Sequence, residues 1–378
     1  MRILTVSHYF DSNRAGVELI AAKIRQQLQS HGHSVRWVAA AAKTAITCST
    51  PSDKDCIAIP MWDGIRTATD LAWPIPSPLA VFKISLEIKA AELVHLHEPF
   101  YPACQMALYL ACCHHKPVVI TQHIADMPVA GQCRKVAVDI ANALLTRPAH
   151  HFANRIVFYS ARSRDYFANS SQGKNVMIYN GCNSSVFHPL PEIAQLGLRE
   201  SLKLPLNRPV ILFVGRFIEK KGLKLLRDVC QARQDLDFVF IGHGPLDPAA
   251  WVLPNVTVLP PKNHKELSQY YQSADCLILP AVGEGFPLVV QEAMCSGLPC
   301  LVSQEIADGC PALADCFITT GQAGRRTLEV LRNHVHKPPN EIIRKTLAQR
   351  AAKLWSWEEC GNQYDSLFRE TLQKHSCR

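Results

Sequence analysis

The 378-residue chain contains no apolar run long enough to cross a bilayer. Its longest apolar region, residues 103–113, is interrupted by Gln105 and is far shorter than the roughly 20 residues that a transmembrane helix needs. The first residues, MRILTVSHYF, lack the long apolar core and cleavage site of a secretory signal peptide. We therefore expect a cytoplasmic protein without a membrane span of its own.

Several common cofactor and metal motifs are also missing. Ser7-His8-Tyr9-Phe10 stands where a dehydrogenase would have a GxGxxG turn after the first strand. The 15 cysteines include no CxxC spacing, so we expect reduced, buried thiols and no structural zinc. The two D-x-D triplets, residues 53–55 and 235–237, do not follow a predicted strand, where they could hold a divalent cation on a diphosphate. We expect no metal and no cofactor.

The formal charge of +8 is concentrated in the first half of the chain. Residues 1–190 contain 18 Lys and Arg against 12 Asp and Glu, whereas the remainder contains 22 against 20. This excess favours an anionic surface or acceptor, such as a membrane leaflet or a lipid diphosphate. A generally basic cytosolic protein is the alternative. Nucleic acid is disfavoured, because no aromatic-rich strand motif or basic recognition helix accompanies the charge.

Residues 284–292, EGFPLVVQE, have the pattern of a loop that enters a helix. Apolar runs of strand length precede and follow them, so we predict a strand, a loop, a helix and a second strand. Gly285 would let the backbone approach a ligand, and Pro287 suits the first turn of a helix. Gly297 and Pro299 predict the end of that helix.

This predicted helix start suits a nucleotide sugar. The N–H groups at a helix N-terminus, here near Phe286 and Leu288, bind phosphate. Glu284 in the loop and Glu292 two turns into the helix would repel phosphate, so we expect both to accept hydrogen bonds from sugar and ribose hydroxyls. The alternative is that both glutamates are ordinary solvated side chains.

A second segment, residues 211–223 with the sequence ILFVGRFIEKKGL, also passes from an apolar strand through a glycine into a helix. Arg216 and Lys221 would meet an anion at the carboxyl end of the strand, where open α/β sheets bind ligands. Arginine can hold phosphate through two N–H bonds, and lysine acts as a point charge. Gly215 and, in the later segment IGHGP, Gly244 mark turns that could lie close to a ligand or only reverse the chain.

The chain resembles the family 4 retaining glycosyltransferases of the GT-B fold (glycosyl transferases group 1) in the segments GRFIEKKG, IGHGP, SADCLILPAVGEGFPLVVQEAMCSGLP and MIYNGCNSSVFHP. The resemblance runs nearly end to end, from MRILTVSHYF to the late WSWE. It implies an α/β protein with two Rossmann-like parallel-sheet domains facing across a cleft. We expect an acceptor domain over residues 1–188, a linker over 189–209, a nucleotide-sugar domain over 210–354 and a helix over 355–378 that crosses back to the first domain.

The resemblance also implies roles for residues in the first half. The first loop of the relatives usually carries a glycine pair near the transferring sugar; here Gly16 matches, but Ala15 departs from the pattern. The relatives have a histidine near the reacting carbon, and His123 follows a predicted strand, although the residues alone favour a structural histidine. His95 and His97 share a strand face, but no third metal ligand is evident.

Together these features predict a hexosyl- or N-acetylhexosaminyltransferase that moves a sugar from a nucleoside diphosphate to an acceptor hydroxyl without metal. The predicted catalytic residues are Glu284, His123, Arg216 and Lys221, and the predicted donor-binding residues are Gly16, Gly215, Gly244, Gly285, Phe286, Pro287, Leu288 and Glu292. A nucleotide-sugar epimerase on the same fold and a non-catalytic nucleotide-sugar-binding protein are the alternatives.

The expected acceptor is a glycan or a lipid-linked glycan precursor of polysaccharide or cell-envelope biosynthesis. The basic, amphipathic segment Leu79–Ala91, with Lys83 and Lys89 beside Phe82, Ile84 and Leu86, would then contact the inner face of an anionic membrane. Judged from its residues alone, an apolar stripe of this kind is more often part of the core.

Overall fold

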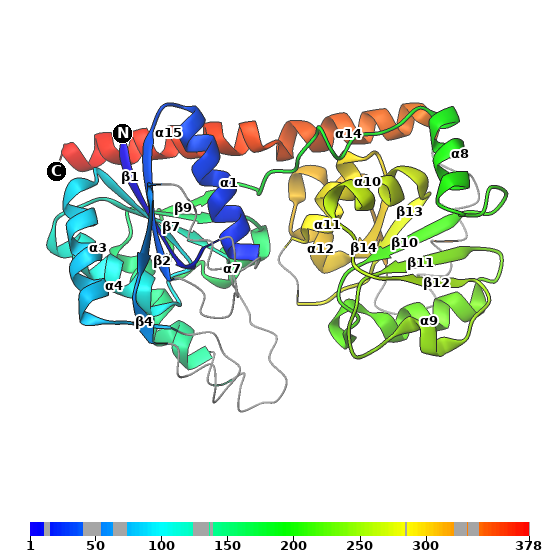
Figure 1. The fold of residues 1–378 in the computed structure, drawn as a ribbon, viewed down its shortest axis with the longest axis horizontal. Helices are drawn as coiled ribbons and strands as arrows, with labels where there is room; N and C mark the ends of the chain where they lie inside the picture. Colours follow the sequence, from blue (N-terminus) through cyan, green and yellow to red (C-terminus); the bar gives the residue numbers. More distant parts are fainter. Residues whose placement is uncertain are drawn as a thin grey trace. The chain divides into compact units, whose positions relative to one another are not determined.

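The computed structural model describes residues 1–10, 16–40, 54–62, 74–123, 136, 139–283, 286–320, 331 and 340–377. The chain forms two compact units (Figure 1). Unit 1 comprises Met1–Asn180 and Trp357–Arg378, and unit 2 comprises Gly181–Ser356. In the part of the chain that is described, no helix is both long enough and apolar enough to span a membrane.

Unit 1 is built on a parallel sheet with the strand order β3-β2-β1-β6-β7-β8-β9. Its strands are β1 (Arg2–Tyr9), β2 (Ser34–Ala40), β3 (Cys56–Ile59), β6 (Leu93–His97), β7 (Val118–Gln122), β8 (Arg155–Phe158) and β9 (Asn175–Met177), with β4 (Met61–Trp62) and β5 (Ile75–Pro76) forming a separate antiparallel pair. Its helices are α1 (Gly16–Ser30), α3 (Pro78–Ala90), α4 (Pro102–Cys113), the π-helical turn η2 (Asn142–Thr146), α6 (Arg147–Phe152), α7 (Ala161–Tyr166) and α15 (Trp357–Ser376).

Helices cover both faces of this sheet, which is what strands buried on both sides require. Successive residues of β1 show the two faces, since side chains alternate along a strand. Leu4 belongs to the core cluster formed with α3 and α4, and Ile3 belongs to the cluster formed with α1 and α15. The sheet therefore has a hydrophobic core on each side.

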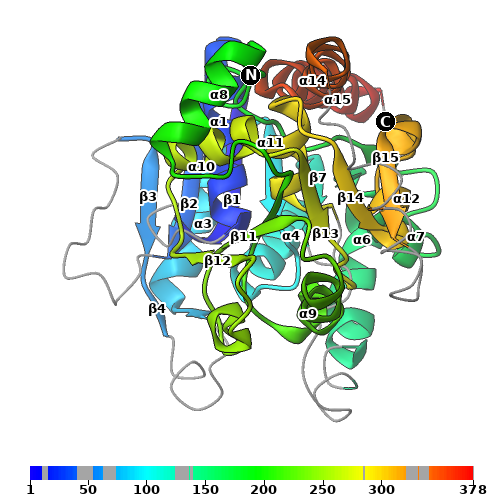
Figure 2. The same ribbon diagram turned by 90° about the vertical axis from the view of Figure 1, so that its right-hand side faces the viewer.

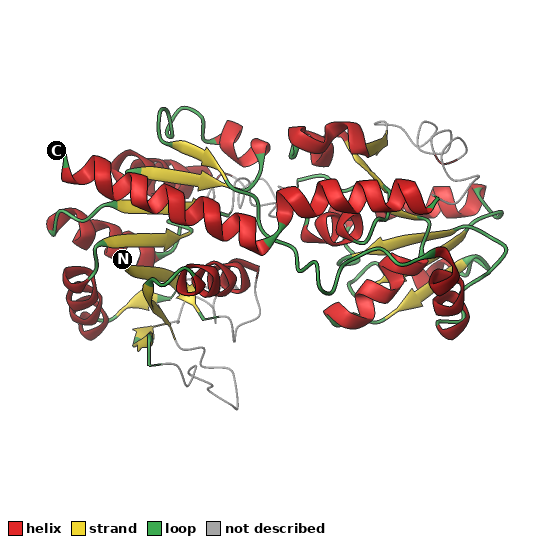
Figure 3. Cartoon of the chain, turned by 90° about the horizontal axis from the view of Figure 1, so that it is seen from above, coloured by secondary structure: helices red, strands yellow, loops and turns green. Residues whose placement is uncertain are grey.

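The C-terminal helix α15 is an integral part of unit 1 (Figure 3). Cys360, Tyr364, Leu367 and Phe368 recur at helical spacing and pack in one cluster with α1 and the sheet. The Tyr364 hydroxyl also lies 2.9 Å from Thr121 Oγ1 on β7. Apolar packing and this buried hydrogen bond join the last helix of the chain to the strands formed by its first half.

Unit 2 has a six-stranded parallel sheet in the order β12-β11-β10-β13-β14-β15 (Figure 2). Its strands are β10 (Val210–Val214), β11 (Asp237–Ile241), β12 (Val256–Leu259), β13 (Cys276–Leu279), β14 (Cys300–Ser303) and β15 (Phe317–Thr320). Its helices are α8 (Glu192–Ser201), η3 (Glu219–Lys221), α9 (Leu223–Ala232), η4 (Pro248–Trp251), α10 (His264–Ser273), α11 (Leu288–Cys295), α12 (Gln304–Asp308), η5 (Pro311–Cys316) and α14 (Glu341–Trp355).

Residues 189–209, which we expected to form a linker, belong to unit 2 and contain α8. Arg199 fixes this helix to the unit, because its guanidinium lies 2.5 Å from Asp275 Oδ2 and donates to the Ser273 carbonyl at 2.7 Å. The four prolines that suggested an irregular connection lie before and after the helix rather than within it. The division between the units falls earlier, after Asn180.

Candidate functional site

The sheet of unit 2 has a topological switch point between β10 and β13. These two strands pair with each other, but the chain continues from β10 to β11 on one side and from β13 to β14 on the other. Open α/β sheets bind ligands beyond the carboxyl ends of the strands at such a point. The two segments singled out in the sequence follow these two strands, so the fold brings both of them to the position where a ligand is expected.

Two contacts hold these segments against each other. The Val282 N–H after β13 donates to the Lys220 carbonyl after β10 at 2.9 Å. Gly222 has φ +79°, and a Cβ at this position would lie 2.7 Å from both Cγ and the carbonyl oxygen of Pro280. Only glycine fits there without displacing the loop that follows β13.

The glycine turns after β10 and β11 also interlock. A Cβ on Gly242, which has φ +156°, would lie 1.9 Å from the Gly215 carbonyl oxygen. A Cβ on Gly244 would lie 2.4 Å from the Phe217 carbonyl oxygen, and the Phe217 N–H donates to the His243 carbonyl at 2.8 Å. Gly244 therefore has a packing role, because its missing side chain lets the two loops meet. Its contact with a donor stays a prediction.

The two predicted cations of this loop differ in exposure. Arg216 is exposed directly after Gly215, whereas Lys221 at the end of η3 is buried. The Cε of Lys221 lies 3.7 Å from the position that a Cβ on Gly215 would occupy. The lysine side chain therefore lies along the end of β10. A lysine that is mostly buried at the carboxyl end of a strand can supply positive charge to a diphosphate, and charges attract more strongly there than in bulk water.

Helix α11 begins at the predicted place. Pro287 is its N-cap, Leu288 is its first residue, and the helix ends at Cys295 with Ser296 as its C-cap, before Gly297, which has φ +73°. Phe286 is buried against the rings of Phe317 and Trp355, so only its backbone could face a ligand. The predicted residues Glu284 and Gly285 lie outside the described residues.

Glu292 is a buried carboxyl group on α11 and not a solvated side chain. The Tyr271 hydroxyl donates to its Oε2 at 3.0 Å, and His264 Nδ1 lies 3.6 Å from its Oε1. Burial raises the pKa of Glu292 to about 7, although the hydrogen bond from Tyr271 acts in the opposite direction. Near neutral pH this group can therefore either accept a hydrogen bond from a hydroxyl or donate one.

Unit 1 has the corresponding switch point between β1 and β6, and His123 follows the neighbouring strand β7. His123 Nε2 lies 3.0 Å from His97 Nδ1, and its backbone N–H donates to Glu98 Oε2 at 3.0 Å. Burial lowers the pKa of His123 to about 3. The imidazole is thus neutral at physiological pH and takes part in hydrogen bonds rather than in ion pairs.

The sequence did not predict the contacts that two residues, Glu98 and Gln122, make around His123. Glu98 is fully buried with φ +65°, and its carboxylate accepts from the Gln122 side-chain amide at 2.8 and 3.0 Å. Gln122 Oε1 in turn lies 3.0 Å from His150 Nε2. The only sequence signal for these groups is that β6 and β7 end in polar residues; the positive φ of Glu98 has no local signature.

The other predicted positions of unit 1 are less informative. Gly16 begins α1, and no atom of the described residues lies within 4 Å of a Cβ built on it, so packing against those residues does not require glycine there. Ala15 lies outside the described residues. His95 and His97 have ring centroids 4.3 Å apart, and His95 Nε2 lies 2.8 Å from Thr121 Oγ1. Among the residues that the structure covers, no three His, Cys, Asp or Glu side chains converge as metal ligands.

Comparison with known proteins gives two family matches. Residues 14–186 match the model of Glycosyltransferase Family 4, and residues 196–314 match that of Glycosyl transferases group 1. A Bacillus subtilis glycosyltransferase named for teichuronic acid biosynthesis is 33% identical over 98 residues, which is 26% of this chain and only 25% of that protein's length. An uncharacterized glycosyltransferase of Methanocaldococcus jannaschii is 25% identical over 296 residues, which covers 73% of this chain and 74% of that protein.

Solved structures share the fold at low sequence identity. Sucrose-phosphate synthase of Thermosynechococcus elongatus superimposes with a TM-score of 0.75 at 18% identity, over 99% of this chain and 100% of the other. The Anabaena protein HepE in complex with UDP-glucose gives a TM-score of 0.68 at 17% identity, over 98% and 100%. Both likenesses show that the fold is GT-B.

Proposed function

Because the chain belongs to the family 4 glycosyltransferases of group 1 with the GT-B fold, we propose that it transfers a sugar from a nucleoside diphosphate donor to an acceptor hydroxyl with retention of configuration. One observation carries the proposal. The segments after β10 and β13 meet at the switch point of unit 2, where buried Lys221 and exposed Arg216 lie close to the segment that leads into α11. The complex of HepE with UDP-glucose, a protein of the same fold, supports a donor of this class.

In the proposed donor site, different residues would bind the diphosphate, the ribose and the transferring sugar. Lys221, Arg216 and the N–H groups at the start of α11 would stabilise the diphosphate as it leaves with increasing negative charge. Glu292 would bind the ribose hydroxyls, since its carboxyl group can accept or donate a hydrogen bond near neutral pH. We retain Glu284 as the group that binds the transferring sugar.

The proposed chemistry needs no covalent intermediate on the protein. The acceptor oxygen forms a bond to the anomeric carbon on the face from which the diphosphate leaves. The bond between the anomeric carbon and the phosphate oxygen breaks. The proton of the acceptor hydroxyl passes to the leaving phosphate. Because the pKa of His123 is about 3, its imidazole would assist as a neutral hydrogen-bonding group. The family resemblance places this histidine near the reacting carbon.

We also propose that the reaction needs no divalent cation. The D-x-D triplet of unit 2 ends at Asp237, the first residue of β11, and so lies at the amino edge of the sheet, away from the carboxyl ends of the strands. Both carboxylates have arginine partners there: Asp235 pairs with Arg233 at 2.8 Å, and Asp237 pairs with Arg208 at 3.1 Å. The positive charge for the diphosphate would come from Arg216 and Lys221.

Helix α3 supports a cytoplasmic enzyme that contacts an anionic membrane and uses a lipid-linked acceptor of polysaccharide or cell-envelope biosynthesis. One face of α3 is core, with Ala80, Ile84 and Ile88 buried, so for Ile84 the interpretation of the apolar stripe as core is confirmed. A second face exposes apolar side chains, with Leu79 at 55%, Phe82 at 62% and Leu86 at 48%. Lys83 and the exposed Lys89 lie on the same helix.

A thermal-shift panel of UDP, GDP, ADP and their sugars tests the donor site. We expect one base to stabilise the protein by about 2.7 kcal/mol at a hundredfold excess over Kd. Arg216→Ala should weaken that effect, whereas Arg227→Ala, which removes an exposed arginine of α9, should not. The proposal fails if no nucleotide stabilises the protein, or if both variants respond like the unmodified chain.

A further inference from the structure

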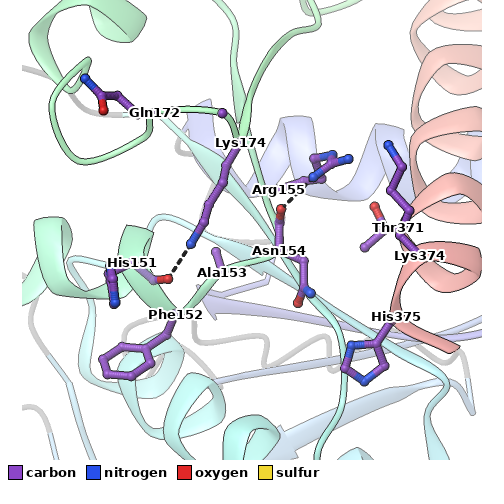
Figure 4. Close-up of a pocket in the computed structure, with 11 residues that line it drawn as sticks. His151, Phe152, Ala153, Asn154, Arg155, Gln172, Lys174, Thr371, Lys374 and His375 are labelled. Carbon is purple, nitrogen blue, oxygen red and sulfur yellow. Dashed lines mark hydrogen bonds between the residues drawn. The ribbon is translucent and has the colours of Figure 1, made fainter. Parts of the chain in front are cut away.

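A basic cavity lies in unit 1, at the edge of its sheet opposite the edge near His123. Its volume is about 380 Å³ (Figure 4). Arg155 begins β8 and Asn175 begins β9, so the cavity lies at the amino ends of these strands. His123 follows the carboxyl end of the parallel strand β7, at the other edge of the same sheet. The cavity is therefore separate from the site assigned to sugar transfer.

Three segments that are distant in the sequence form its walls. The lining residues are His151, Phe152, Ala153, Asn154 and Arg155 from the end of α6 and the start of β8, Gln172, Gly173 and Lys174 from the turn before β9, and Thr371, Lys374 and His375 from the end of α15. In Figure 4, Lys174 lies across the cavity from Arg155 and Lys374, and Asn154 lies between them. A ligand bound here would touch the sheet edge and the C-terminal helix together.

The lining contains three permanent cations and no acidic residue. Glu370, beside the cavity, pairs with Lys374 and lies 3.6 Å from Arg155 Nη2, so a single carboxylate faces two of the cations. The Lys174 ammonium group donates to the backbone carbonyls of His150 and His151. These carbonyls position the ammonium group but carry no net charge, so the wall as a whole remains positive.

We propose that this cavity binds a phosphate-bearing ligand and that the bound phosphate fastens the end of α15 to the amino edge of β8 and β9. Arginine and lysine are the residues that recognise phosphate, and the Gln172 and Asn154 amides add neutral polar groups. The volume accommodates a group larger than one phosphate, such as a phosphate monoester of a sugar or nucleoside. A free solute and a phospholipid headgroup share this chemistry.

The test is hydrogen exchange of the full chain in inorganic phosphate, compared with chloride at the same ionic strength. We expect protection of residues 151–155, 171–175 and 368–377, and its position separates this site from the diphosphate site near residues 215–222. Lys374→Glu should weaken the protection about tenfold or more in apparent Kd, whereas Lys374→Arg should retain it. Lys345→Glu is the matched control, because Lys345 pairs with Glu341 four residues away on α14, as Lys374 does with Glu370.

A second arm uses vesicles of phosphatidylglycerol and phosphatidylcholine to identify the source of the phosphate. Protection by inorganic phosphate assigns the cavity to a soluble ligand, and protection by the anionic vesicles alone assigns it to a lipid headgroup. Two results overturn the proposal: equal protection in chloride, phosphate and vesicles, or protection that survives Lys374→Glu unchanged. Failure of this site would leave the donor-site proposal intact, because the two tests report on different segments of the chain.

Discussion

Burial favours the uncharged form of one ionisable group in each unit, Glu292 and His123. It raises the pKa of Glu292 to about 7 in unit 2 and lowers the pKa of His123 to about 3 in unit 1. Desolvation disfavours the charged form of both groups. A carboxyl group is charged when it is deprotonated, so its pKa rises. An imidazole is charged when it is protonated, so its pKa falls. Both side chains can thus form hydrogen bonds with hydroxyls without a permanent charge.

The raised pKa of Glu292 predicts how stability changes with pH. Between pH 4.5 and 7 the folded protein keeps a proton on Glu292 that the unfolded chain releases, so this group lowers stability as the pH rises through that window. Glu292→Gln removes this effect. The free energy of unfolding of the variant, relative to that of the unmodified protein, should therefore rise by roughly 3 kcal/mol from pH 5 to pH 8. Amide exchange of β13 and α11 at the two pH values measures this.

The matched control is Glu200→Gln, which changes an exposed carboxyl group on α8 of the same unit. It should show no gain that depends on pH. A constant difference between Glu292→Gln and the unmodified protein across the pH range would contradict the raised pKa.

At the level of single residues, the sequence predicts a position well only when neighbouring residues in the chain mark it. Arg216, Lys221 and Glu292 stand next to a strand end or within a helix, so the sequence alone was enough to predict their places in the fold. Their contact with a ligand stays a prediction. Glu98 could not be found in this way, because its role depends on donors from Gln122 and the His123 backbone, 24 and 25 residues later. A positive φ at a glutamate also has no sequence signature.

At the scale of elements, predictions succeeded where the stop signals are local. Helix α11 ends before Gly297, whose φ of +73° and close approach to the Arg344 backbone need glycine. Helix α8 was missed, because the prolines around it suggested an irregular connection. Its position is fixed by the contacts of Arg199 with Asp275 and Ser273, about 75 residues away in the chain.

Helix α3 carries the prediction about membranes. Its exposed Leu79, Phe82 and Leu86, together with Lys83 and Lys89, should bind phosphatidylglycerol vesicles at low salt and release them as salt rises. Lys83→Glu with Lys89→Glu should weaken binding about tenfold or more, at roughly 1 kcal/mol for each basic residue near the surface. Vesicle co-sedimentation measures the effect.

Phe82→Ser should also weaken binding, and Ile342→Ser, which removes an exposed apolar side chain of α14 in unit 2, should not. Nucleotide binding should survive every one of these changes. Equal binding to neutral and anionic vesicles, or no binding at low salt, would contradict the membrane assignment.

At the scale of the whole molecule, the two units share one plan. In each sheet the first three strands along the chain lie on one side of the switch point and the later strands on the other. The family resemblance, together with a length of 378 residues, made two parallel-sheet units predictable. The boundary was not predictable to the residue, because residues 181–209 join unit 2 through contacts distant in sequence rather than through any change in composition.

The most direct test of the central claim is the release of nucleoside diphosphate from a panel of nucleotide sugars in excess EDTA. The proposed function predicts that at least one donor is turned over, and that Lys221→Ala and Arg216→Ala each lower the rate about 10²-fold or more, whereas Arg227→Ala does not. It is contradicted if no donor is hydrolysed, if EDTA abolishes turnover and Mg²⁺ or Mn²⁺ restores it, or if the folded Lys221→Ala and Arg216→Ala variants keep the full rate.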